Sequence, residues 1–471
     1  MTRRLRKVLV IVAAAGLTSC GGGESPSIDG ASCYPEAARA WISGASGASG
    51  AARDPGGPMS VYLDGSASMV GFIRGGTADE KPLADLIGML PSLDTIDHAK
   101  LTISRFDRSF TDLKSADVSR MQTEAGYLCP AGNRNCDAQE SHIDQALGRV
   151  AAEDPKSLSV IVSDLWLANS EVRTTDGVAL SKPLADIFAS GRSVAVYGFE
   201  SPYSGRVSDL PSGSRTVTAA RRHLFLVVAG PVERLRAFRD AMRNAPSASI
   251  ARALGNGEAH YSLFTLDPVV TASDGTQPFE LKAGGPLTKA SFLTVRTGVR
   301  VPQYHLDRGA ALRSSGGGGA SWRGVPETGV LPGAVWQGTS QGTTKLYRRL
   351  GDKCLPKGGD WREEGKLAGG WPTDGGARFT LDPSELATLP PATYLLVGSV
   401  RRTSLLSPNP ATQWMRDWSF DAAGEAVAVK QPVMPTLNLA ETARLLEVAL
   451  LKSAESKPMN IGGFAVAVEI E

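Results

Sequence analysis

Several features that mark common enzyme and binding classes are missing from this 471-residue chain. It has no Cys-x-x-Cys pair, which argues against a zinc or dithiol redox site. Neither Ser66 nor Ser68 lies in a Gly-x-Ser-x-Gly motif, so a serine hydrolase acting through one of them is the weaker alternative. Its five histidines are scattered over His98, His142, His223, His260 and His305.

Dense runs of one charge are also missing. The chain has 50 basic and 48 acidic residues, a formal net charge of +2, and no Lys/Arg cluster of the kind that lines a nucleic-acid groove. We therefore expect no nucleic-acid partner. Beyond one ten-residue stretch near the N-terminus there is no long apolar run, so we expect no transmembrane helix.

That stretch, Val8 to Leu17, follows a basic segment and ends in Leu17-Thr18-Ser19-Cys20. The pattern is typical of an export signal, and its last four residues resemble the lipobox of bacterial lipoproteins. The resemblance implies a signal peptide over 1–19, lipidation of Cys20, and a membrane-anchored place in the cell envelope, at the outer membrane or facing the periplasm. The alternative is an ordinary secreted protein with a chance cysteine at the cleavage site.

Residues 20–58 are rich in Gly, Ala, Ser and Pro, which predicts a flexible tether with at most a short helix near Tyr34 to Ile42. Four further cysteines are an even number in an exported chain. Cys129 and Cys136 flank one polar loop and are predicted to form a local disulfide. Parity alone would then pair Cys33 with Cys354.

Small oxygen-bearing side chains follow the first predicted strand. Met59 to Leu63 is apolar and bounded by Gly-Pro, and Asp64, Ser66 and Ser68 follow at a spacing of two. In a tight loop leaving a strand, alternate side chains can converge, and hard oxygens suit Mg²⁺ or Mn²⁺. The other interpretation is a polar turn in which Asp64 forms an Asx-turn.

Apolar strands alternate with helices over 59–250. Strands are expected at 100–106, 158–164, 193–199 and 223–229, with helices beginning near 83, 141, 184 and 232. This alternation predicts an α/β fold with a doubly wound, mostly parallel sheet. Asp64 and Asp164 fall at the carboxyl ends of strands, where ligands bind in such sheets.

Three separated segments of 59–250 together resemble the von Willebrand factor A (vWA) domain and its metal-ion-dependent adhesion site. They are Asp64-x-Ser66-x-Ser68, the Ser141-His142-Ile143-Asp144-Gln145-Ala146-Leu147 segment, and the strand ending in Asp164. The resemblance implies that Ser66, Ser68 and Ser141 bind Mg²⁺ (or Mn²⁺ or Ca²⁺) directly, and that Asp64 and Asp164 hold its waters. It also implies an open position for an acidic residue of a protein partner.

Ser141 departs from the family, which has Thr at this position. It has a second explanation as a helix N-cap with Asp144 as its capping-box partner. Thr111 is the backup candidate for this ligand. Asp164 likewise has the alternative of capping the following turn, and Trp166 is either a contact aromatic or a packing residue.

Residues 255–471 show short alternating strands separated by Gly/Pro-rich loops. This pattern predicts a β-rich domain, with an immunoglobulin-like sandwich as one form, and an amphipathic C-terminal helix over 438–453. Trp414 and Trp418 are expected in its core. The chain as a whole is expected to be a non-enzymatic lipoprotein that binds a protein partner, with a metal-free scaffold as the alternative.

Overall fold

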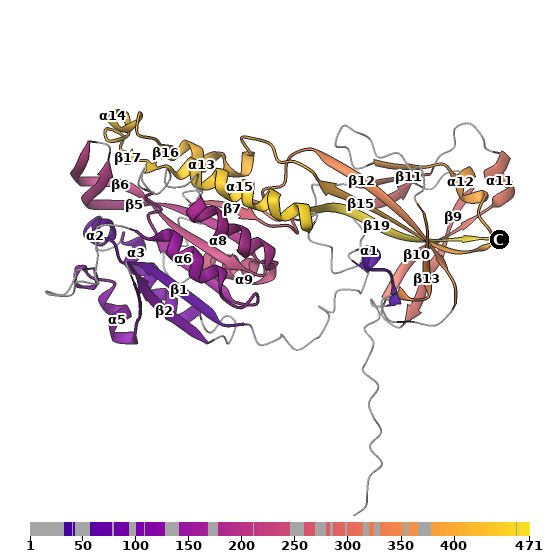
Figure 1. Ribbon diagram of the computed structural model, residues 1–471, viewed down its shortest axis with the longest axis horizontal. Coiled ribbons are helices and arrows are strands. Elements are labelled where there is room, and N and C mark those ends of the chain that lie inside the picture. The colour runs from indigo at the N-terminus through magenta and orange to yellow at the C-terminus, as the bar shows by residue number, and fades with distance from the viewer. Residues whose placement is uncertain are drawn as a thin grey trace, which may run out of the picture.

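The fold was analysed in a computed structural model that describes residues 33–39, 41–42, 57–77, 80–93, 100–107, 109–127, 141–167, 178–210, 212–244, 259–268, 279–282, 286–296, 299–313, 320–324, 330–351, 355, 358–365, 378–457 and 459–471. Two parts lie side by side along its long axis (Figure 1). One contains the helices and a large sheet, and the other is built mainly of strands. The chain is therefore α/β with further β-sheets, as the strand and helix patterns predict.

The large sheet has eight strands. Its order is β3 (Phe110–Asp112), β2 (Leu101–Phe106), β1 (Met59–Asp64), β4 (Leu158–Ser163), β6 (Gly213–Gly230), β5 (Ser193–Leu210) and β7 (Ala259–Phe264), with β17 (Val433–Met434) beside β6. β1 is parallel to both β2 and β4, whereas β6 is antiparallel to β4 and to β5. The sheet is mixed rather than mostly parallel.

A long hairpin explains this difference from the expected order. β5 and β6 continue far beyond the predicted strands at 193–199 and 223–229 and meet at a tight turn before Gly213, whose φ is +102°. Strands joined by so short a turn must be antiparallel, so β6 takes the place between β4 and β5. The hairpin packs closely on α2 (Ala67–Arg74), where a Cβ on Gly205 would lie 2.7 Å from the Gly71 Cα.

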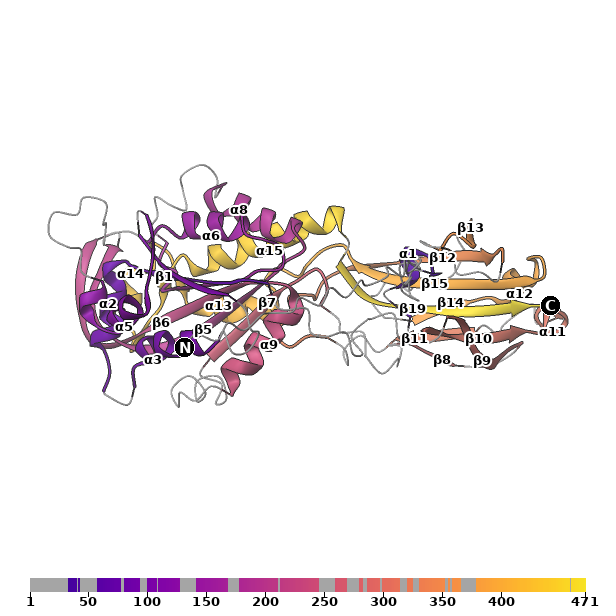
Figure 2. The same cartoon turned by 90° about the horizontal axis from the view of Figure 1, so that it is seen from below.

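Helices cover both faces of this sheet (Figure 2). Alternate side chains of a strand point to opposite faces, and β1 accordingly places Tyr62 in one apolar core and Val61 and Leu63 in another. The Tyr62 face is covered by α6 (Ile143–Ala151), α8 (Val178–Ala189) and α15 (Leu439–Ser456). The opposite face is covered by α2, α3 (Pro82–Met89), α5 (Ser115–Arg120) and α9 (Val232–Arg243).

The C-terminal region returns to this part of the molecule. β17 pairs with β6, α13 (Gln413–Asp417) and β16 (Ser419–Phe420) lie over the sheet, and α15 packs on α8. α14 (Glu425–Ala428) and β18 (Thr436–Leu437) complete the segment. The α/β part therefore draws on residues outside 59–250, the range expected from the sequence, and the C-terminal helix belongs to it rather than to the β-rich part.

The second part contains two sheets. The six-stranded sheet has the order β13 (Trp361–Gly365), β12 (Ser340–Arg349), β15 (Ala392–Arg402), β19 (Met459–Ile470), β10 (Val299–Leu306) and β9 (Leu287–Arg296). The three-stranded sheet is β14 (Arg378–Leu381), β11 (Ala320–Gly324) and β8 (Phe279–Lys282). The two sheets meet through Phe379 and Phe464, whose ring centroids are 5.3 Å apart. Short helices α11 (Arg308–Arg313) and α12 (Pro383–Ala387) lie near the end of this part.

Part of the predicted tether is packed against the six-stranded sheet. α1 (Glu36–Arg39) and its neighbours form an apolar cluster with Trp361 and the outer face of the sheet, in which Cys33, Tyr34 and Trp41 are buried. Cys33 is disulfide-bonded. The short helix expected near Tyr34 to Ile42 is therefore present as α1, and residues 33–39 and 41–42 are packed rather than free, because their aromatic side chains supply the apolar area that the surrounding Gly/Ser composition lacks.

Candidate functional site

The loop between β1 and α2 presents the three predicted oxygen donors at the carboxyl end of β1. Asp64 is the last residue of the strand, and its Oδ1 accepts a hydrogen bond of 2.8 Å from the Ser66 backbone N–H. This Asx-type bond is the turn that the alternative interpretation of Asp64 predicts. Asp64 and Ser66 are buried, whereas Ser68, in the first turn of α2, is partly exposed.

Ser141 joins this loop from the segment before α6. Its hydroxyl donates to Asp64 Oδ2 and lies 3.1 Å from Ser66 Oγ. Ser66 Oγ is in turn 3.0 Å from Ser68 Oγ. α6 begins after His142, and the Ser141 hydroxyl does not cap it. The structure therefore brings together all three hydroxyls that the sequence singled out, and the capping-box interpretation of Ser141 is wrong.

The spacing of these hydroxyls fits a small divalent cation. Mg²⁺ takes octahedral oxygen ligands at about 2.1 Å, which places neighbouring ligands at right angles about 3.0 Å apart. The separations from Ser66 Oγ to Ser68 Oγ and to Ser141 Oγ match that value. Because Ser141 donates its only proton to Asp64, its oxygen turns lone pairs rather than a proton toward Ser66 and toward an ion beside it. Ser66, Ser68 and Ser141 are the residues that would hold it.

The buried Asp64 carboxylate is hydrogen-bonded to the hydroxyl cluster and fixes its position. Its Oδ2 also accepts a 2.7 Å bond from Ser163 Oγ, the last residue of β4. Burial raises the pKa of Asp64 to about 6, repulsion from Asp164 adds to the rise, and hydrogen bonds from Ser141, Ser163 and the Ser66 N–H oppose it. A cation at the hydroxyls would favour the charged carboxylate, as opposite charges do. Within the described residues, no group of three or more His, Cys, Asp or Glu side chains could hold a metal, so the candidate depends on hydroxyl donors.

Asp164 has a partner that the sequence did not suggest. Its Oδ2 lies 3.2 Å from Nη2 of Arg222 on β6, and both side chains are almost fully buried, with exposures of 0% and 1%. The guanidinium also lies 4.5 Å from the Trp166 ring and 4.6 Å from the Tyr203 ring. Asp164 Oδ1 accepts a longer bond of 3.3 Å from the Trp166 N–H. Asp164 thus caps the turn, as its alternative interpretation predicts, and also pairs with a cation.

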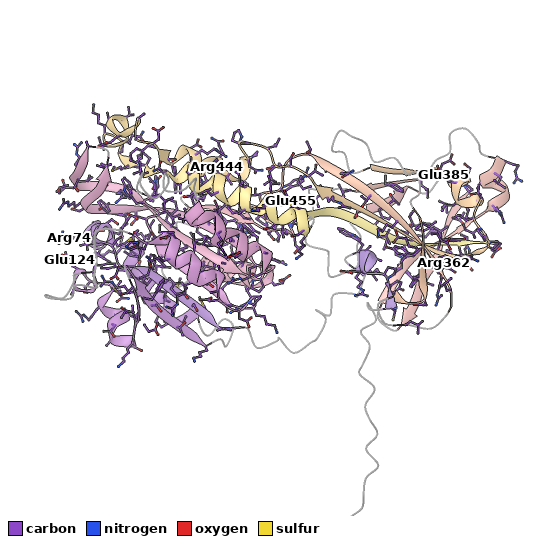
Figure 3. The ribbon with its side chains drawn as sticks, viewed as in Figure 1. Arg74, Glu124, Arg362, Glu385, Arg444 and Glu455 are labelled. Atoms are coloured by element: carbon purple, nitrogen blue, oxygen red, sulfur yellow. The ribbon has the colours of Figure 1, made fainter. Side chains whose placement is uncertain are left out.

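Other charged side chains around the loop form their own pairs. Arg105 donates to the Gly65 carbonyl at 3.2 Å and pairs with Asp107 at 3.2 Å. At the far end of α2, Arg74 pairs with Glu124 at 2.7 Å on the surface (Figure 3). The backup candidate Thr111 lies exposed on the edge strand β3, opposite Arg105, and the structure does not bring it to the hydroxyl cluster.

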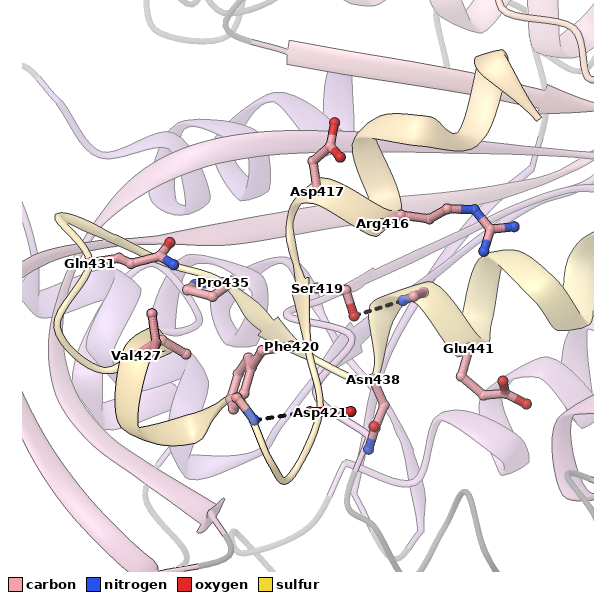
Figure 4. A pocket seen from close by; sticks show the side chains of 13 residues that line it. Arg416, Asp417, Ser419, Phe420, Asp421, Val427, Gln431, Pro435, Asn438 and Glu441 are labelled. Carbon is pink, nitrogen blue, oxygen red and sulfur yellow. Dashed lines mark hydrogen bonds between the residues drawn. The ribbon is translucent and has the colours of Figure 1, made fainter. Parts of the chain in front are cut away.

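A pocket of about 590 Å³ lies beside the loop that follows β4 (Figure 4). Its wall residue Phe420 packs on Trp166 at 5.6 Å, and Asn438 donates to the Leu167 carbonyl at 3.0 Å. The pocket carries three carboxylates, each engaged nearby: Asp417 with Gln413, Asp421 with the N–H groups of 423 and 424, and Glu441 with Arg444. Two of its wall residues therefore pack against the loop that follows β4.

An aromatic cluster fixes the C-terminal segment to the sheet. Trp418 stacks on His223 with ring centroids 3.8 Å apart, and Trp414 stacks on His260 at 5.3 Å. Trp414 also donates to Ser262 Oγ at 2.7 Å. Both tryptophans are packing residues, as expected, but they pack on the α/β part rather than in the β-rich part.

Sequence reasoning missed Ser163 and Arg222. Ser163 precedes Asp164 directly, and its position at a strand end was the available signal. No feature of the sequence marked Arg222 as a functional residue, because a basic residue beside Arg221 is typical of a solvated strand end. Cys20, Cys129, Cys136 and Cys354 lie outside the described residues, and with them the predicted lipidation and the predicted 129–136 disulfide. No helix in the described part of the chain is long and apolar enough to cross a membrane.

Comparison of the chain with protein-family models, with curated proteins and with solved structures gives no match to any of them.

Proposed function

We propose that this chain is a cell-envelope lipoprotein that binds a protein partner through a vWA-like, divalent-cation-dependent site. Ser66, Ser68 and Ser141 bind Mg²⁺, with Mn²⁺ or Ca²⁺ as the other candidates, and an acidic residue of the partner completes the coordination. The single observation that carries this proposal is the pair of 3.0 and 3.1 Å separations that join the three hydroxyls in front of a buried carboxylate.

The site's position supports the same proposal. The loop after β1 and the residues after β4 lie at the carboxyl ends of adjacent parallel strands, where open α/β sheets bind ligands. Ser68 is partly exposed, so an ion held there has a route to a partner. The ion would supply Lewis acidity toward a carboxylate, and the chain's own residues would orient the hydroxyls and keep Asp64 ionised.

A metal-free scaffold within an envelope assembly is the second candidate. One observation favours it: Arg222 already supplies a buried positive charge to Asp164. A serine hydrolase has less support, because the contacts of the Ser66 hydroxyl are with Ser68 and Ser141.

Calorimetric titration of the full-length mature chain with Mg²⁺ and Mn²⁺ tests the proposal. The whole chain is needed because residues 410–456 pack on the α/β part. We expect one weak site, since Mg²⁺ keeps several waters when a protein offers few carboxylates. Ser68→Ala should weaken binding, whereas the matched change Thr111→Ala, at the exposed edge strand, should not. If the folded wild-type chain binds neither ion at millimolar concentration, with or without acetate, the metal-free scaffold is favoured instead.

The lipoprotein part has its own test. When the full chain is expressed with its signal peptide, the mature protein should carry acyl mass on Cys20 and partition into detergent. Cys20→Ala should abolish both properties. An unmodified N-terminus at another residue, found by mass spectrometry, would favour the ordinary secreted protein.

A further inference from the structure

We infer that Arg222 sets the charge of the ion site, so that it weakens cation binding but makes the ion-loaded site selective for an anionic partner group. This inference rests on the proposed function and concerns the ligand preference of the same site. It follows from where the guanidinium lies and from the number of charges that surround it.

The position of Arg222 is the first step. It contacts Asp164 at 3.2 Å, and Ser163, the residue before Asp164, donates to Asp64 Oδ2 at 2.7 Å. The guanidinium also lies 5.7 Å from the ring of Phe72 in α2, the helix that carries Ser68. With both partners buried, water screens this charge poorly, so it acts on an ion at the hydroxyls at an effective dielectric far below that of water.

The charge count is the second step. Asp64 and Asp164 contribute two negative charges and Arg222 one positive charge, which leaves one negative charge before an ion binds. A divalent cation converts this to one positive charge. Without Arg222, the same ion would produce a neutral site. Arg105, the other guanidinium at the loop, is paired with Asp107 and changes neither sum.

The consequence is a pair of opposite effects. Removing the Arg222 charge should strengthen cation binding, because two acids then face the ion. It should also weaken the capture of a carboxylate by the loaded site, because the excess positive charge is gone. A purely structural role for Arg222 would not produce changes of opposite sign, so the two measurements together identify an electrostatic role.

The test measures Mn²⁺ affinity by calorimetry at pH 7.5, in the absence and presence of acetate as the carboxylate probe. Arg222→Met should bind Mn²⁺ at least about tenfold more tightly than the wild-type chain. The tightening of Mn²⁺ by acetate, which linkage makes reciprocal, should be smaller than in the wild type. Arg221→Met is the matched control, since Arg221 is the adjacent residue but pairs with Glu80 on the surface at 2.6 Å.

Two more variants keep the test decisive if Arg222→Met folds poorly, as a change that leaves the buried Asp164 unpaired can do. The double variant Arg222→Met/Asp164→Asn restores the wild-type net charge and should restore the wild-type acetate effect. Asp164→Asn alone removes one negative charge and should weaken Mn²⁺ binding while strengthening the acetate effect.

Each result decides between the two proposals. If the wild-type chain binds Mn²⁺ but the folded Arg222→Met chain does not change Mn²⁺ affinity and the acetate effect in opposite directions, the role of Arg222 is refuted and the proposed function stands. If Arg222→Met does not fold, the role is refuted when the double variant keeps the same two values as Asp164→Asn alone. If none of the folded variants binds Mn²⁺, the proposed function fails, and the inference fails with it.

Discussion

The Ser141 hydroxyl donates a hydrogen bond to Asp64, a residue 77 positions earlier in the chain, and at the same time touches Ser66 Oγ. This relationship fixes the segment before α6 against the end of β1. Ser141, like Ser66, is therefore hydrogen-bonded to the Asp64 carboxylate and also belongs to the hydroxyl cluster. Its role can be separated from that of Ser163, which bonds to the same carboxylate oxygen.

We predict that Ser141→Ala lowers the free energy of unfolding by about 1.5–3 kcal/mol, the usual cost of a hydrogen bond to a charged group, and also lowers Mg²⁺ affinity. Ser163→Ala is the control, because Ser163 donates to Asp64 Oδ2 at 2.7 Å but makes no contact with Ser66. It should cost similar stability and leave ion affinity closer to the wild type. Urea unfolding and calorimetry measure the two effects, and equal ion affinities in both variants would contradict the assignment of Ser141.

His223 predicts a pH dependence of stability. Burial, aided by Arg222 and His260, lowers its pKa from 6.5 to about 3. The unfolded chain therefore takes up a proton below pH 6.5 that the folded chain refuses until about pH 3. Stability from this residue is complete above pH 6.5 and is lost as the pH falls through that window, at about 1.4 kcal/mol per pH unit and up to about 5 kcal/mol in all.

His223→Phe keeps a ring against Trp418 but removes the titration. Its stability should fall less steeply than that of the wild-type chain between pH 6.5 and 4, measured by urea unfolding at several pH values. Identical slopes for His223→Phe and the wild type would show that the folded chain protonates the His223 imidazole over the same pH range as the unfolded chain.

Two glycines should respond to alanine in opposite directions. A Cβ on Gly198 of β5 would lie 2.6 Å from Trp414 and 2.7 Å from Trp418, so Gly198→Ala should cost about 1–3 kcal/mol through overpacking and alter tryptophan fluorescence. A Cβ on Gly148, inside α6, meets nothing within 4 Å. Gly148→Ala should stabilise the chain by up to about 1 kcal/mol. Thermal unfolding of both variants checks the contrast, which would be absent if the C-terminal segment were not seated on β5.

Cys33 is predicted to pair with Cys354. Trp361, seven positions after Cys354, donates from Nε1 to the Cys33 carbonyl at 3.1 Å and stacks on Tyr34 at 6.0 Å. These contacts add a spatial argument to the parity of the cysteines. Peptide mapping of the unreduced protein should find a Cys33–Cys354 peptide and a separate Cys129–Cys136 peptide. A peptide that links Cys33 to Cys129 or Cys136 would contradict the pairing.

Local pattern accounts for most of what could be predicted. The apolar strand before Asp64, the spacing of Asp64, Ser66 and Ser68, and the strand that ends near Asp164 are all properties of short segments, and the structure has them where they were expected. The hydroxyl cluster could be anticipated because the carboxyl ends of adjacent parallel strands, here β1 and β4, meet at one edge of a sheet.

The remainder depends on contacts between distant segments. Nothing local indicates that 193–199 and 223–229 extend into one hairpin, or that Val433 pairs with Arg221. Arg222 could not be found for the same reason: its partner is 58 positions away, and only the folded hairpin removes it from water. Tertiary placement decides whether an arginine is a solvated charge or a buried one.

The docking of residues 33–42 on the six-stranded sheet has a mechanical consequence. A pull on the N-terminal side of Cys33 enters the molecule at the β-rich part, through a packed aromatic cluster, and not through the sheet that carries the hydroxyls. α1 and α2 lie in different parts of the molecule, well apart along its long axis (Figure 1). With an anchor at Cys20, tension toward the membrane would therefore load the β-rich part first. The hydroxyl cluster beside α2 would then stand at the end of the molecule away from the point of attachment (Figure 1).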